Sequence, residues 1–233
     1  HLSIRRQRQM CIRDSYMAVS GDPGLQRLCA LKTVLDDKDA GGASPASHKF
    51  LDEALLATKF SNENVVYVFD AGVVDREAYL AMEYIGGKPL QAVMDRCVER
   101  GAPMTLGLAM FVIQELCAGL AYVHGFQKLN LIHRDVCPSN VMLSYTGGVK
   151  LIDFGVVKWG GQAPQATGGL AWGKTHYMSP ELHLGTAIDH RSDIFSAGVL
   201  LWEMLAGRPL FPRDKPRPLR PQLFPPSHSP SPC

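Results

Sequence analysis

The sequence predicts an α+β fold in which a strand-rich part precedes a helical part. Apolar runs of strand length, separated by turn-like segments, fill most of residues 16–85. Apolar residues with helical spacing dominate from residue 90 onward. The chain has 233 residues, of which 46% are hydrophobic, so it can bury one sizeable core divided into two lobes.

The first part of the chain is expected to form two hairpins and one helix. "SYMAVS" (15–20) and "RLCALKTV" (27–34) have the composition of strands, and "GDPG" makes a turn between them. Residues 64–74 and 78–85 form a second pair of apolar runs, separated by the turn-like "DRE". Between the hairpins, residues 48–60 carry apolar side chains near one face of a helix.

The second part of the chain is expected to be mainly helical. Helices are predicted over residues 90–101, 105–126 and 193–207, and the last is apolar nearly all round, which indicates a central position. Two short strands, 140–145 and 149–155, are predicted around a Gly-Gly turn. Strand-rich and helical segments are thus segregated along the chain, as in α+β proteins.

The two ends differ from the rest in composition. Residues 1–15 are polar, basic and aperiodic, and we expect a non-native leader there. Residues 212–233 are basic and rich in proline, so we expect an extended or disordered segment or a non-native tail. Within it "PLRP" matches a PxxP ligand of an SH3-like domain. The expected domain therefore consists of a first lobe, 16–85, and a second lobe, 86–211.

Bulk charge and cysteine usage exclude several classes of function. The formal net charge is +2, from 24 basic and 22 acidic side chains, which gives no general attraction to nucleic acid or to an anionic membrane. The six cysteines show no C-x-x-C pair or metal-ligand spacing, so neither a zinc site nor a disulfide framework is predicted. The apolar segments 106–123 and 194–205 are interrupted by glutamate, which argues against a membrane span. We expect a cytoplasmic domain.

Five side chains could carry out phosphoryl transfer, which needs bound phosphates, fixed metal ions and an aimed hydroxyl. Lys32 in "CALKTV" could hold phosphates, and Glu53, on the predicted helix, could orient that lysine. In "HRDVCPSN" Asp135 could accept the hydroxyl proton. Asn140 in the same stretch and Asp153 in "LIDFG" offer the oxygen ligands that Mg²⁺ prefers.

The order and spacing of these motifs are more specific than any one of them. HRDxxxxN is followed by DFG, whose aspartate lies thirteen residues beyond the asparagine, then by "YMSPE" and "DIFSAG". On these residues the segment from Tyr16 to about Phe211 resembles a protein kinase catalytic domain, most closely the bacterial eukaryote-like serine/threonine kinases. The resemblance implies a bilobal kinase fold and transfer of the γ-phosphate of Mg·ATP to a Ser/Thr hydroxyl of a protein substrate.

The resemblance also implies roles that spacing alone does not supply. Met82 is expected to be the gatekeeper of the adenine pocket, and Asp193 to brace the catalytic loop from the central helix. The expected adenine contacts are the apolar side chains of Ala30 and Met142 and the hinge backbone of Glu83, Tyr84 and Ile85.

The sequence departs from the family pattern in several places, among them Lys174, which stands where Ser/Thr kinases commonly carry a threonine. Cys137 stands where Ser/Thr kinases usually carry lysine, and loss of such a cation costs roughly 2.7 to 4 kcal/mol in the transition state if nothing compensates. Residues 8–15 contain no glycine where a glycine-rich loop is implied. The arginine partner implied for Glu181 is also missing, so both lobes are expected to be incomplete. Two alternatives remain open: a pseudokinase that acts as a binding and scaffold module or is an inactive fragment, and a small-molecule kinase.

Overall fold

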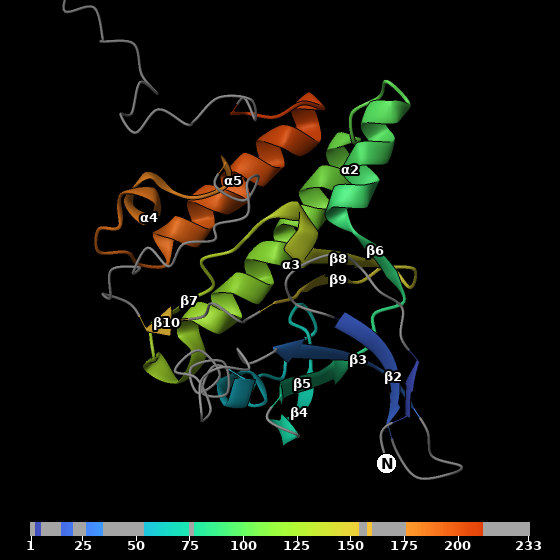
Figure 1. Cartoon of the computed structure of the whole chain (residues 1–233). Helices are drawn as coiled ribbons and strands as arrows, with labels where there is room; N and C mark the ends of the chain where they lie inside the picture. The colour runs from blue at the N-terminus through green and yellow to red at the C-terminus, as the bar shows by residue number, and fades with distance from the viewer. Residues whose placement is uncertain are drawn as a thin grey trace, which may run out of the picture.

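The computed structural model describes residues 3–5, 15–20, 27–34, 54–74, 77–153, 158–159 and 176–211. Among these residues a strand-rich lobe and a helical lobe are connected through residues 84–86 (Figure 1). The α+β order predicted from the sequence is confirmed, and the arrangement agrees with the bilobal fold that the resemblance implied.

The first lobe contains a five-stranded sheet with the order β1-β2-β3-β5-β4 and antiparallel neighbours. Its strands are β1 (Ser3–Arg5), β2 (Ser15–Ser20), β3 (Arg27–Val34), β4 (Val68–Val74) and β5 (Glu77–Glu83). Side chains alternate along β3, so Cys29 and Leu31 join Ala18 and Ala81 in a small core. Lys32, by the same alternation, lies on the opposite face.

The sequence predicted no element within residues 1–15, whereas β1 pairs with β2 there. Strands pair through their backbone N–H and C=O groups. The edge of β2 can therefore pair with an extended segment of any composition. No apolar periodicity is needed, which explains why the pattern gave no signal. The helix predicted over residues 48–60 falls partly outside the described residues, and residues 54–57 are helical.

Three helices of ten or more residues follow the connection and belong to the second lobe. They are α2 (Leu90–Glu99), α3 (Leu106–Gly125) and α5 (Arg191–Ala206), with the short α4 (Pro180–Leu184) before α5. Thr105 caps α3 by accepting from the amide of Leu108, and Ser179 caps α4 from the amide of Leu182. α5 ends at Gly207, whose φ of 64° suits glycine, so the chain turns there.

The long helix α3 contributes many residues to the large hydrophobic core of the second lobe. Its buried residues, Ala109, Val112, Ile113, Leu116, Gly119, Leu120 and Val123, recur with helical spacing. α3 packs against α5 and β9 (Val149–Leu151) (Figure 1). The segment Leu106–Lys128 is long and apolar enough to cross a membrane by length and composition alone, a property that core helices share.

Two small sheets lie beside the helices of the second lobe. β6 (Gly87–Pro89), β8 (Val141–Ser144) and β9 form one sheet, in that order. β7 (Leu131–Ile132) pairs with β10 (Lys158–Trp159) in the other. The first lobe is tied to β9, because Val66 N donates to Leu151 O at 2.9 Å and Leu151 N donates to Asn64 O at 2.8 Å.

The central position predicted for the helix over residues 193–207 agrees with the burial of α5. Eight residues of α5 are buried, and Ile194 and Leu205 are its exposed large apolar side chains. Exposed apolar side chains gather instead at the start of α3, at Leu106, Leu108, Met110 and Phe111.

Candidate functional site

The loop 133–140 is held in place from α5. Asp193, which is 1% exposed, accepts from the backbone amides of His133 and Arg134, both at 2.8 Å. Its Oδ2 also lies 2.7 Å from Nε2 of His124 on α3. Arg134 adopts a φ of 67°, which costs energy for a residue other than glycine, and the two amide bonds to Asp193 fix that conformation. This is the bracing role that the resemblance implied for Asp193.

Asp135 and Asn140 are joined directly across this loop. Nδ2 of Asn140 donates to the backbone oxygen of Asp135 and to its Oδ2, both at 2.8 Å. Since the amide nitrogen is engaged in these bonds, the carbonyl oxygen of the Asn140 side chain is the atom that can serve a cation. The loop thus fixes one carboxylate oxygen and leaves an amide oxygen suited to a metal ion.

Backbone contacts bring Asp153 to the same place. Ile152 N donates to Asn140 O at 2.9 Å, and Ile152 O lies 3.1 Å from Nε2 of His133. The next residue, Asp153, has a φ of 69°. A second strained non-glycine backbone at the same site indicates that its surroundings impose the orientation of this carboxylate.

Lys32 reaches this carboxylate from the other lobe. Its side chain is 9% exposed, and its ammonium group forms an ion pair with Oδ1 of Asp153. Lys32 lies opposite Leu80 in the register of β3 and β5, so its position is set by the sheet. The site therefore joins groups from β3, the loop 133–140 and the end of β9. Glu53, the predicted partner of Lys32, lies outside the described residues, so that pairing stays a prediction.

The residues predicted to surround adenine lie along the connection between the lobes. Ala30 and Met82 are opposite each other in β3 and β5, and Met142 lies opposite Pro89 of β6, just past the connection. Tyr84 and Ile85 belong to the connecting segment itself.

Glu83 has contacts that sequence reasoning missed. Its Oε1 accepts from Nζ of Lys150 at 2.7 Å and from the amide of Tyr67 at 2.8 Å. Its own amide donates to Tyr67 O at 2.9 Å. These contacts fix the start of the connection against β9 and against the segment before β4. They span long sequence separations, so no local pattern could have revealed them.

Cys137 lies inside the same loop and is 2% exposed. Its Sγ is 3.7 Å from Oδ1 of Asp135 and 3.2 Å from Oγ of Ser139. The cysteine thus contacts the carboxylate oxygen that Asn140 does not hold. Sequence reasoning treated this residue as a missing cation and did not identify either contact.

A row of polar side chains on α5 holds the segment Tyr177–Glu181. Glu203 accepts from Oη of Tyr177 at 2.7 Å, and Ser196 Oγ donates to Tyr177 O at 2.7 Å. Ser192 Oγ donates to Oε1 of Glu181 at 2.7 Å. Burial alone would raise the pKa of Glu181, but the hydrogen bonds, that of Ser192 first, lower it below its ordinary value. Ser192 therefore holds the carboxylate for which the resemblance implied an arginine.

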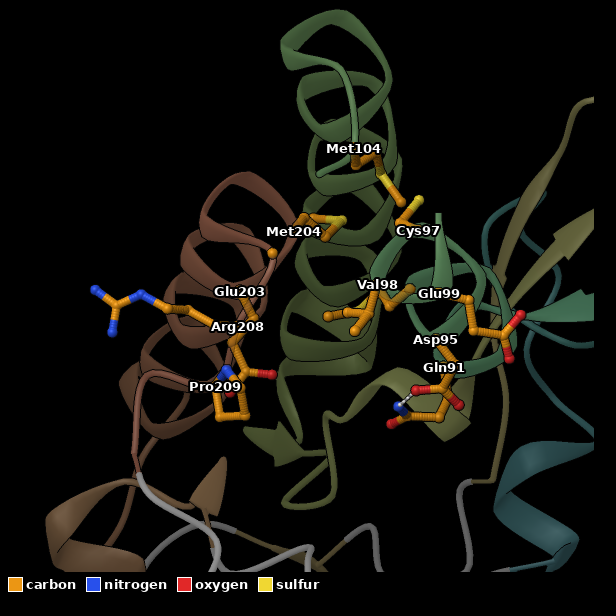
Figure 2. A pocket seen from close by; sticks show the side chains of 12 residues that line it. Gln91, Asp95, Cys97, Val98, Glu99, Met104, Glu203, Met204, Arg208 and Pro209 are labelled. Carbon is orange, nitrogen blue, oxygen red and sulfur yellow. Dashed lines mark hydrogen bonds between the residues drawn. The ribbon is translucent and has the colours of Figure 1, made fainter. Parts of the chain in front are cut away.

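A separate pocket of about 330 Å³ lies between the ends of α2 and α5 (Figure 2). It is lined by Gln91, Met94, Asp95, Cys97, Val98, Glu99, Met104, Glu203, Met204, Gly207, Arg208 and Pro209. None of the predicted site residues lines it, so this pocket is distinct from the site around Asp135.

The chain is similar in sequence to known proteins. The family described as "Protein kinase domain" matches residues 22–222. Serine/threonine-protein kinase PksC of Streptomyces coelicolor is 34% identical over 84% of this chain and 35% of its own length. Serine/threonine-protein kinase PknL of Mycobacterium tuberculosis is 37% identical over 83% of this chain and 46% of its own. Tyrosine-protein kinase MasK of Myxococcus xanthus is 34% identical over 75% of this chain and 30% of its own. The chain spans less than half the length of each of these relatives.

Proposed function

Because this chain belongs to the protein kinase family, we propose that it is the catalytic part of a protein serine/threonine kinase. It transfers the γ-phosphate of Mg·ATP to a Ser/Thr hydroxyl of a protein substrate. The family in general uses ATP, a divalent metal ion and a protein substrate. The observation that carries the proposal is that Lys32, Asp153, Asn140 and Asp135 meet at one place between the lobes. They are joined there by an ion pair and by side-chain and backbone hydrogen bonds.

ATP is bound from the connection and from β3. The backbone of Glu83, Tyr84 and Ile85 hydrogen-bonds adenine, and Met82 lies behind it. Ala30 and Met142 cover the two faces of the ring. Lys32 holds the α- and β-phosphates, and Glu53 orients its ammonium group through an ion pair. The contacts of Glu83 with Lys150 and Tyr67 support this arrangement, because they fix the hinge backbone.

Asn140 and Asp153 hold Mg²⁺. The donor set fits this ion, since an amide oxygen and a carboxylate are hard ligands and magnesium takes few protein ligands beside phosphate and water. The bond between Ile152 N and Asn140 O supports the pairing, because it places the two residues next to each other. Held by Asn140 and Asp153, Mg²⁺ would supply positive charge that offsets the charge developing on the transferred phosphate.

Asp135 orients the substrate hydroxyl and accepts its proton. Asn140 fixes Oδ2 of this carboxylate, so the hydroxyl meets a base of defined direction. The segment Tyr177–Glu181, held on α5, forms part of the surface that receives the protein substrate. Pro138 favours Ser/Thr over Tyr as the acceptor. The domain works in the cytoplasm, where ATP is available.

The variant Asp135→Asn tests this function. Transfer to a Ser/Thr peptide should fall by about a hundredfold to ten thousandfold, because an amide cannot accept the proton. The affinity for Mg·ATP should stay within about twofold, since Asp135 does not contact the phosphates in this account. The matched control is Asp95→Asn on α2, an exposed carboxylate that accepts from Gln91.

The outcomes separate the proposed function from its alternatives. Wild-type turnover that is lost in Asp135→Asn and kept in Asp95→Asn supports the kinase. Equal turnover in wild type and Asp135→Asn contradicts the role of Asp135. ATP binding without transfer in wild type favours the pseudokinase, and transfer to a small alcohol alone favours a small-molecule kinase.

A further inference from the structure

We propose that Cys137 is a positioning residue whose thiol orients the carboxylate of Asp135. This inference rests on the proposed function, in which Asp135 receives the substrate proton. Cys137 stands where related kinases usually carry a lysine, and the proposal gives this cysteine a role of its own in catalysis. It concerns the direction of the base and leaves nucleotide binding unaffected.

The local backbone brings three side chains together. Cys137 is extended, with φ of −154° and ψ of 163°. A short 3-10 helix, Pro138–Asn140, begins directly after Cys137, and the side chains of Asp135 and Ser139 both lie beside the thiol. Sγ lies 3.7 Å from Asp135 Oδ1 and 3.2 Å from Ser139 Oγ. A carboxylate only accepts, so the S–H group donates to Asp135, and the serine hydroxyl can donate to the sulfur.

The carboxylate of Asp135 is therefore held at both oxygens. Asn140 Nδ2 donates to Oδ2 at 2.8 Å, and the thiol donates to Oδ1. The bond from the thiol restricts the rotation of the carboxyl group in addition to the bond from Asn140. A thiol is a weak donor in water, but this one is 2% exposed, and a hydrogen bond is stronger where water is excluded.

Cys137 also belongs to the hydrophobic core cluster, so packing alone is the competing explanation. The two explanations predict opposite rankings of the serine and alanine variants: a packing role makes Cys137→Ser the more damaging change, and a positioning role makes Cys137→Ala the more damaging one. Serine keeps a donor but places a hydroxyl group in an apolar setting, which a packing role would penalise. Alanine stays apolar but removes the donor, which a positioning role would penalise.

The experiment measures kcat, KM for ATP and ATP affinity for the whole chain with a Ser/Thr peptide. Cys137→Ala should lower kcat about fivefold, the loss expected for one modest hydrogen bond, with KM for ATP within about twofold of wild type. Cys137→Ser should restore kcat to within about twofold of wild type. Cys117→Ala, which removes a half-buried thiol on α3, is the control and should leave kcat unchanged.

Two results would overturn the proposal while the kinase function stands. The first is a Cys137→Ala enzyme with wild-type kcat, and the second is a Cys137→Ser enzyme as slow as the alanine variant. A wild-type chain that binds ATP but transfers no phosphate would overturn the proposed function and this inference together.

Discussion

At the scale of single residues, Asp153 connects the strand-rich lobe with the helical lobe. It follows β9 with a φ of 69°, and its carboxylate forms an ion pair with Lys32 of β3. A carboxylate in such a place can serve either as the partner of the lysine or as a ligand of a metal ion. The proposed function needs the second use, in which Asp153 is a ligand of Mg²⁺.

The variant Asp153→Asn separates these uses. It should raise the Mg²⁺ concentration needed for half-maximal ATP binding by at least about tenfold, since even outer-shell changes at metal sites cost this much. ATP binding measured without a divalent ion should change little. A titration of ATP affinity against Mg²⁺, with Asp95→Asn as control, checks this. An unchanged Mg²⁺ requirement would remove Asp153 from the metal site.

Helix α5 positions two functional segments at the scale of elements. Its first turn carries Asp193, which holds the amides of the loop 133–140. Further along, Ser192, Ser196 and Glu203 hold the segment Tyr177–Glu181. The buried polar residues of this otherwise apolar helix thus contact the loop 133–140 or the segment Tyr177–Glu181, whereas Arg191 pairs with Asp189 on the surface.

Removing one of these contacts should affect folding. Tyr177→Phe deletes a hydroxyl that donates to the buried Glu203, and we expect it to lower the free energy of unfolding by about 1–3 kcal/mol. Urea unfolding measures this, with Tyr145→Phe as control, because Tyr145 is 76% exposed. A loss no greater in Tyr177→Phe than in the control would show that the contact contributes nothing to stability.

The surface at the start of α3 matters at the scale of the whole molecule. Leu106 is 65% exposed and Met110 47% exposed, and Leu108 and Phe111 lie beside them on the same helix. Exposed apolar patches promote association between molecules. These side chains form an exposed apolar surface at the start of α3, separate from the residues around Asp135.

The double variant Leu106→Glu, Met110→Lys should raise the solubility of the chain. The two side chains are four residues apart, so they form a favourable pair on the helix. The free energy of unfolding should stay within about 0.5 kcal/mol of wild type, as for other surface substitutions. Light scattering against concentration measures the effect, and Val73→Thr, Val74→Thr on exposed positions of β4 is the control. Equal scattering by all three proteins would contradict the account.

Local patterns predicted the elements better than the contacts between them. β2 and β3 occupy the predicted residues, because alternation and a Gly/Pro turn are local signals. β1 was missed, since an edge strand can pair through its backbone alone. The ion pair of Lys150 with Glu83 was missed because the two residues are 67 positions apart.

The candidate site was predictable as a set of residues but not as a geometry. The motifs named Asp135, Asn140 and Asp153, whereas the bond between Ile152 and Asn140 that unites them is a backbone contact without a side-chain signature. The roles of these residues stay predictions, as do Glu53 and the segments 1–15 and 212–233. The contact of Cys137 with Asp135 depends on an extended backbone that the proline turn alone did not reveal.

The most direct test of the central claim is a transfer assay with radiolabelled γ-phosphate. The whole chain and its Asp135→Asn variant are incubated with Mg·ATP and a mixture of Ser/Thr and Tyr peptides, and ATP binding is measured in parallel. The account predicts label on serine or threonine with wild type, loss of that label in the variant, and equal ATP binding by both. ATP binding without label on any peptide, or label that persists in Asp135→Asn, would contradict it.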